Sequence, residues 1–121
     1  MNIKRVARIS EEVKKVVSEL LLTDLKDPRI SSMTSVTHVD VTNDLSYAKI
    51  YISVLGSDEE KQETIKGLKS AKGFVRKEIS KNIDIRHTPQ PIFILDESIE
   101  RGVRLTKLIE EVNKDNGGKN E

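Results

Sequence analysis

Lysine and arginine side chains gather between positions 65 and 86 of this 121-residue chain, and a glycine lies in their middle. Ammonium and guanidinium groups pair with phosphate oxygens, and the free backbone N–H groups at the start of a helix also bind anions. Gly73 stands beside Lys72, Arg76 and Lys77 in this segment. These residue types predict electrostatic binding to a phosphate backbone.

The apolar residues of the same segment recur every three or four positions, which is the spacing of one face of a helix. They are Ile65, Leu68, Ala71, Val75, Ile79 and Ile83. A straight helix would bring Lys72 to the edge of this apolar face. Because Gly73 lacks a Cβ atom and tolerates unusual dihedral angles, we expect a helix, a kink at Ala71-Lys72-Gly73 and a second helix.

The same spacing fits an ordinary solvated helix face. On such a face the lysines serve solubility, and the glycine lets a neighbouring element pack closely. Charge runs on helices are usually of this kind. Both interpretations stay open on the spacing alone.

Composition excludes several classes of protein. The chain contains no cysteine, so disulfide frameworks, thiolate metal sites and cysteine nucleophiles are excluded. The sequence has no apolar stretch typical of a membrane span or a signal peptide, and we expect a soluble cytoplasmic protein that binds no membrane. Aromatic residues make up only 3% of the chain, which argues against RNA bases stacking on an exposed aromatic platform.

The formal net charge is only +1, so the chain is not basic as a whole. Its charges are unevenly distributed, however. Basic residues crowd positions 4–15 and 66–86, whereas acidic residues concentrate at positions 58–63 and 96–100. This distribution predicts a bipolar surface with one side suited to nucleic acid.

Sequence patterns predict seven elements. Helical periodicity from position 3 to 25 ends at Asp27-Pro28, because proline cannot continue a helix. Segments 33–41 and 47–55 have strand composition and flank a turn, so we expect an antiparallel hairpin. The kinked helix pair follows from about position 58 to 83, then a short apolar strand at 92–95 and a last helix capped by Ser98.

This order predicts an α+β fold in which helices cover a three-stranded sheet. We expect one folded domain over residues 1–112. Residues 113–121 contain Asn, Gly, Lys and Asp without apolar side chains, which predicts a disordered C-terminal tail.

A kinked helix pair before the last strand makes the predicted order resemble the type II KH fold, whose family uses a Gly-x-x-Gly loop to clamp RNA. That loop is missing here, and Ala71-Lys72-Gly73 stands in its place. The replacement and its surroundings resemble the bacterial ribosome-binding factor A family. The matching segments, in order, are Arg5-Val6 with Ile9, Lys26-Asp27-Pro28-Arg29-Ile30, Val36-Thr37-His38-Val39, residues 44–56, residues 71–76, Arg86-His87-Thr88-Pro89 and residues 96–102.

This resemblance implies a non-enzymatic assembly factor that needs no cofactor. It implies binding to the immature small (30S) ribosomal subunit, assistance to maturation of the 16S rRNA near its 5′ end, and release before translation. Importance during growth in the cold is implied as well, and contacts with neighbouring ribosomal proteins stay open. The longer basic tail of some relatives is missing here, so contacts made by such a tail are not expected.

Carried onto this sequence, the resemblance implies a backbone clamp at Ser70, Ala71, Lys72 and Gly73. Further basic residues would pair with phosphates. Arg29 and Arg86 fit a second role equally well, as structural partners of carboxylates. The RNA-binding residues that we expect are Ser70, Ala71, Lys72, Gly73, Arg76, Lys77, Lys81 and Arg86, followed by Lys4, Arg5 and Arg8.

Two other classes of function remain as alternatives, an enzyme and a protein-interaction module. An enzyme is not expected, because His38 and Asp40 alternate along a strand without a third metal ligand and His87 has no nucleophile motif beside it. A protein-interaction module would dock through the kinked helix pair, with Phe74 and Leu45 as its exposed apolar residues. A monomer is the simplest expectation.

Overall fold

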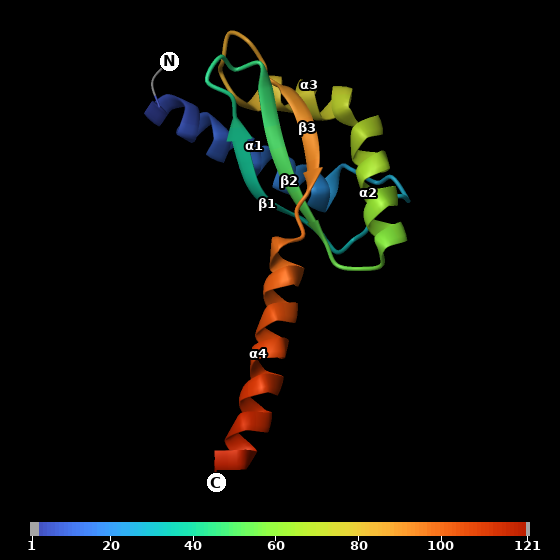
Figure 1. Cartoon of the computed structure of the whole chain (residues 1–121). Helices are drawn as coiled ribbons and strands as arrows, with labels where there is room; N and C mark the ends of the chain where they lie inside the picture. Colours follow the sequence, from blue (N-terminus) through green and yellow to red (C-terminus); the bar gives the residue numbers. More distant parts are fainter. Residues whose placement is uncertain (1–2, 121) are drawn as a thin grey trace.

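The computed structural model of this chain describes residues 3–120, with side chains described as far as position 113. Within these residues the fold is α+β, as the sequence predicts, with four helices and a three-stranded sheet (Figure 1). The elements are α1 (Ile3–Thr23), β1 (Thr34–Val41), β2 (Tyr47–Val54), α2 (Asp58–Ser70), α3 (Lys72–Asn82), β3 (Gln90–Leu95) and α4 (Ser98–Asn120).

The sheet has the strand order β1-β2-β3. β1 and β2 form the predicted antiparallel hairpin, and β3 pairs parallel to β2. The register of the hairpin shifts between Val36 and His38, where one additional residue, Thr37, bulges out of the ladder. β2 is therefore the central strand, and β1 and β3 are the two edges.

One face of the sheet carries the core. Along β2 the side chains alternate, and Ala48, Ile50 and Ile52 are fully buried. They pack in one cluster with residues of α1, such as Val13 and Val17, and with residues of α2 and α3. These three helices lie on the same side of the sheet in Figure 1.

A tight turn joins β1 to β2. The Asp44 carboxylate accepts hydrogen bonds from the Ser46 backbone N–H (3.0 Å) and the Thr42 hydroxyl (2.9 Å), which lower the pKa of Asp44. Leu45 follows with a φ of 60° and is buried. The expectation that Leu45 is an exposed docking residue is wrong, because the turn directs it into the core.

The helix pair is interrupted at Ala71, whose φ and ψ are −89° and 6°. α2 begins with a capping box, in which Ser57 and Glu60 exchange hydrogen bonds through side chain and backbone. The interruption falls on the first residue of the predicted Ala71-Lys72-Gly73 segment. Gly73 is the second residue of α3, and the chain does not require a positive φ there.

β3 starts two residues earlier than predicted and includes Pro91. The Gln90 N–H donates to the Ser46 carbonyl oxygen of the neighbouring chain segment, so the next nitrogen along the strand, that of Pro91, faces outward. Proline is tolerated there, since an edge strand does not need that N–H for its ladder.

α4 does not cover the sheet, so among the described helices α1, α2 and α3 provide the predicted covering. Figure 1 shows it extending away from the rest of the fold. Its apolar residues Ile99, Leu105, Leu108 and Val112 are each more than half exposed. The helices α1, α2 and α3 already cover the core face of the sheet. The apolar side chains of α4 therefore do not pack on that face.

The predicted disordered tail, residues 113–121, overlaps the end of α4. The side chains of this segment beyond position 113, and residue 121 altogether, lie outside what the structure describes. Disorder of the tail, and with it a domain boundary at residue 112, stays a prediction.

Candidate nucleic-acid interface

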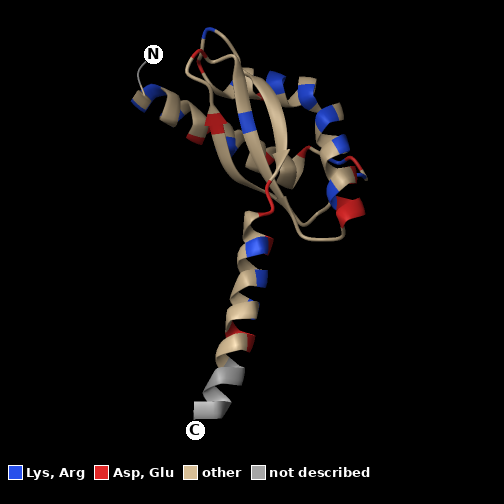
Figure 2. Cartoon of the chain, in the orientation of Figure 1, with Lys and Arg blue, Asp and Glu red and all other residues tan. Residues whose placement is uncertain are grey.

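Four of the basic residues expected to bind RNA, Lys72, Arg76, Lys77 and Lys81, lie on α3, and α2 carries further lysines beside them. The buried positions of α3 are Val75 and Ile79, which face the core, so the positions between them point outward. Figure 2 shows lysines and arginines along both helices. The exposed or half-buried ones are Lys66, Lys69, Lys72, Arg76, Lys77 and Lys81.

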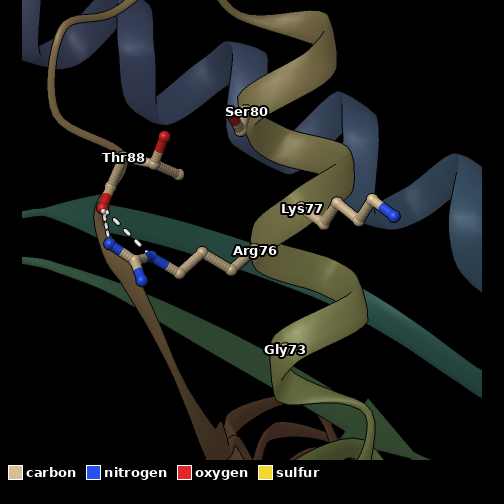
Figure 3. A pocket seen from close by; sticks show the side chains of 5 residues that line it. All are labelled: Gly73, Arg76, Lys77, Ser80 and Thr88. Atoms are coloured by element: carbon tan, nitrogen blue, oxygen red, sulfur yellow. Dashed lines mark hydrogen bonds between the residues drawn. The ribbon is translucent and has the colours of Figure 1, made fainter.

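A shallow hollow of about 370 Å³ opens between α3 and the chain that leads into β3. Its lining residues are Gly73, Arg76, Lys77, Ser80 and Thr88, drawn in Figure 3. Two of these residues are cationic and none is acidic. A hollow of this kind accommodates an anion better than an apolar ligand.

Arg76 spans this hollow. Its guanidinium donates to the backbone carbonyl oxygen of Thr88 through Nη2 at 3.2 Å and Nε at 3.4 Å (Figure 3). The bonds join α3 to the segment before β3 and fix the plane of the guanidinium. The other edge of the group, at Nη1, can still donate to a ligand.

Gly73 is exposed, and a Cβ atom built on it would meet nothing within 4 Å. The alternative interpretation of the sequence, that this glycine lets a neighbouring element pack closely, is therefore excluded for the described residues. Gly67 has that role instead, because a Cβ atom there would lie 2.8 Å from Ile30 Cγ1 and 3.3 Å from Arg29 Cβ. The open space at Gly73 leaves the backbone accessible to a ligand.

Two other predicted residues flank the hollow. Ser70 is the last residue of α2 and is exposed, just before the interruption at Ala71. Lys81 lies near the end of α3, and its Nζ is 3.6 Å from Glu78 Oε1. Phosphate binding by Lys81 would compete with this exposed ion pair, which is weak by nature.

The N-terminal basic residues Lys4, Arg5 and Arg8 are exposed at the start of α1. This part of α1 lies along β1, because Ile3 and Ala7 line a hollow together with His38 of β1. The start of α1 and the basic side of α3 are widely separated in Figure 2. The structure does not bring these three residues together with the hollow at α3.

Arg29 and Arg86 have different surroundings. The Arg29 guanidinium lies 2.7 Å from Asp27 Oδ2 and donates to the same carboxylate through Nε. This hydrogen bonding, together with the Arg29 backbone N–H, lowers the pKa of Asp27 to about 2. Arg29 is thus a structural partner of a carboxylate, whereas Arg86 is exposed in the loop after α3.

The other functional classes gain no support from the geometry. Among the side chains described, those of residues 3–113, no three His, Asp or Glu are grouped so that they could hold a metal ion. No helix in the described part of the chain is long and apolar enough to cross a membrane. Phe74, which is 42% exposed, is the one remaining candidate for apolar docking on the helix pair, since Leu45 is buried.

The comparison with protein families identifies the family of this chain. The sequence model of ribosome-binding factor A matches residues 5–109, which run from the first turn of α1 to the middle of α4. The chain belongs to the ribosome-binding factor A family. The resemblance seen in the sequence is thereby confirmed.

Relatives named ribosome-binding factor A are similar over nearly the whole chain. The protein from Finegoldia magna is 51% identical over 121 residues, covering 99% of this chain and 100% of the relative. The protein from Clostridioides difficile is 54% identical over 117 residues, covering 97% and 91% respectively.

Solved structures of the family share the fold. The solution NMR structure of a putative ribosome-binding factor A from Thermotoga maritima has a TM-score of 0.68 at 35% identity, covering 78% of this chain and 89% of that one. The crystal structure of ribosome-binding factor A from Thermus thermophilus has a TM-score of 0.65 at 19% identity, covering 74% and 94%. A homology model of the Thermus protein, fitted into a cryo-EM map of a 30S complex, has a TM-score of 0.63 at 18% identity, covering 76% and 96%.

Sequence reasoning missed Lys61, which is 5% exposed. Its Nζ lies 2.6 Å from Glu100 and 3.3 Å from Glu97, so it ties the start of α4 to α2 and joins the two acidic segments. Hydrogen bonding to Glu100 raises the pKa of Lys61. The signal was available, because Lys61 lies four residues before Ile65 on the apolar face of α2 and a lysine there needs carboxylate partners.

Proposed function

We propose that this member of the ribosome-binding factor A family is a ribosome assembly factor that binds the immature 30S subunit through the α2–α3 region. The observation that carries the proposal is the cationic hollow beside an open glycine at the start of α3. The 30S complex of the Thermus relative supports the choice of subunit.

The binding is electrostatic. Ala71, at the N-cap of α3, has no side-chain oxygen, so the cap leaves the first N–H groups of α3 without a side-chain acceptor. A phosphate can approach these groups closely, because Gly73 carries no Cβ atom. Arg76 and Lys77 then pair with neighbouring phosphates, and Ser70, Lys81 and Arg86 extend the surface on either side.

The details of the proposed function are those that the family resemblance implies. In this proposal the protein assists maturation of the 16S rRNA near its 5′ end and leaves the subunit before translation, without catalysing a reaction. The fold belongs to the type II KH-like class, with Ala71-Lys72-Gly73 in place of the glycine loop. The protein acts as a monomer in the cytoplasm, and it is most needed in the cold.

Reversible release fits the charge distribution. The whole chain has a net charge of only +1, so the positive charge that can meet phosphates is confined to its basic segments. Contacts with phosphates weaken as salt rises, because each displaces counterions from the RNA. Lys4, Arg5 and Arg8, beside the β1 edge of the sheet, provide a second and separate contact with the subunit.

Equilibrium binding of the full chain to purified small subunits, at several salt concentrations, tests this proposal. We expect binding to small subunits but not to large ones, with an affinity that falls steeply as salt rises. A protein-interaction module docking through Phe74 would instead keep its affinity at high salt, and that result would refute the RNA clamp.

A further inference from the structure

The second face of the sheet is open. The core lies on one face, and α4 extends away from the sheet, so no described helix packs over the other face. On this open face β2 presents Tyr47, Lys49 and Tyr51 at alternate positions. Tyr47 is 45% exposed, and Ile92, which lies opposite Lys49 on β3, is 36% exposed.

The positions of the aromatic residues matter more for base stacking than their small number. The chain has only four Phe and Tyr residues and no Trp, but both tyrosines lie on the central strand of this open face. Phe93 points to the other face and is buried. An open sheet with aromatic rings on its central strand is the arrangement that single-stranded RNA uses for stacking.

The two rings form separate stacking positions. They are four residues apart, which corresponds to about 13 Å along a strand, with the Lys49 ammonium between them. The His38 ring lies against Tyr51 at a centroid distance of 5.7 Å and braces it from β1. Two unpaired bases of an extended RNA strand can reach the two rings, and a phosphate of the chain between them can reach Lys49.

Charge on this face is nearly balanced, because Asp40 lies directly opposite Lys49 in the hairpin register. Base stacking must therefore contribute more here than phosphate pairing. This differs from the hollow at α3, where the lining charges are all positive.

The hollow at α3 lies near the end of the sheet at which Tyr47 stands. Thr88 lines that hollow and accepts the hydrogen bonds from Arg76. Gln90, two residues further along, is exposed and lies opposite Tyr47 in the sheet register. An RNA strand that passes over Thr88 reaches Tyr47 at the same end of the sheet.

We propose that the open face of the sheet binds single-stranded RNA, with bases stacked on Tyr47 and Tyr51 and the phosphate between them on Lys49. This inference rests on the proposed function, because it takes the ligand at α3 to be RNA. It adds a second contact that recognises unpaired nucleotides, which the basic hollow alone does not require.

Tyrosine fluorescence tests the inference directly, since the chain has no Trp and its two tyrosines both lie on this face. Full-length protein is titrated with a single-stranded uridine-rich oligonucleotide, and binding is followed in parallel by anisotropy of the labelled RNA. We expect quenching with the same midpoint as binding. Tyr47→Ala and Tyr51→Ala should each weaken binding by about tenfold, whereas Tyr47→Phe and Tyr51→Phe should retain it.

A control variant and a folding check distinguish a specific loss of RNA binding from a general effect of substitution. Leu22→Ala, at an exposed apolar residue of α1, should not change binding, and circular dichroism checks that each variant folds. The loss caused by Tyr→Ala should be the same at low and high salt. RNA binding without quenching, or normal binding by both alanine variants, overturns this inference and leaves the proposed function standing.

Two further outcomes would also overturn it. If wild-type protein binds neither the oligonucleotide nor small subunits, the proposed function fails together with this inference. If the tyrosine signal changes with protein concentration in the absence of RNA, the occupant of the open face is a second copy of the chain.

Discussion

The Arg76 guanidinium holds the Thr88 carbonyl oxygen with two hydrogen bonds, of 3.2 Å and 3.4 Å. This pair joins the helix that carries the basic residues to the segment entering the edge strand β3. Arg76 therefore shapes the hollow and also offers it a positive charge. A role of this kind depends on the planar fork of arginine, which lysine lacks.

Arg76→Lys separates these two contributions. We expect the variant to bind small subunits about tenfold more weakly than wild type, because the fork to Thr88 is lost. The dependence of affinity on salt should be unchanged, since the charge remains. Arg76→Gln should lower both the affinity and the salt slope, the slope by about one. A normal affinity for Arg76→Lys would show that the pair with Thr88 does not organise the site.

Two glycines give opposite predictions for the same substitution. Gly73→Ala should stabilise the fold by roughly 0.5 to 1 kcal/mol, because alanine suits a helix better than glycine and the site is open. Gly67→Ala should destabilise it by about 1 to 3 kcal/mol, because the new methyl group would meet Ile30 at 2.8 Å. Urea unfolding measures both.

For Gly73→Ala, stability and binding to the small subunit should change in opposite directions. Gly73→Ala should weaken binding to the small subunit in spite of its greater stability, because the methyl group lies where the RNA backbone approaches. If binding by this variant equals wild type, the phosphate backbone does not contact the start of α3.

Lys61 should control the attachment of α4. Lys61→Met leaves Glu97 and Glu100 without their shared cation, so the first turn of α4 should open more often. Hydrogen exchange at residues 97–104 should become faster in this variant. Lys66→Met is the matched control, because Lys66 is exposed and its only ion pair in the described residues is with Glu63 on the same helix.

Acid should destabilise the fold below pH 4. The Thr37 hydroxyl, at 2.6 Å, and Ser98 hold the Asp96 carboxylate and lower its pKa from 3.8 to about 2, and Arg29 does the same for Asp27. A carboxyl group whose pKa is lower in the folded chain stabilises the fold above its unfolded pKa. This contribution should be lost progressively between pH 3.8 and about 2.

Chemical unfolding at several pH values measures this effect. Asp96→Asn should flatten the loss of stability in that pH range, whereas Asp84→Asn, at an exposed carboxylate in the loop after α3, should not. An unchanged pH profile for Asp96→Asn would mean that Thr37 and Ser98 do not hold an ionised carboxylate.

Local patterns predicted most of the fold. Period and composition gave the order of all seven elements, because helices α1 and α2 and strand β2 bury one face each and show it in their spacing. The alternation of Ala48, Ile50 and Ile52 on the core face was visible for the same reason.

Features that depend on contacts between distant parts of the chain could not be predicted from local patterns. The burial of Leu45 depends on a positive φ within the turn, and the start of β3 at Gln90 depends on its edge position. The exposure of α4 depends on which helices already occupy the core face. The hollow at α3 required the hydrogen bond from Arg76 to Thr88, twelve residues away in sequence, which no local pattern indicates.

Co-sedimentation with purified small and large ribosomal subunits tests the central proposal most directly. The variant Lys72→Glu/Lys77→Glu reverses two charges near the start of α3, and Arg104→Glu/Lys107→Glu makes the same change on the exposed surface of α4. We predict that wild type and the α4 variant pellet with small subunits only, and that the folded α3 variant does not. Equal binding by the α3 variant, or no binding by wild type, would contradict the account.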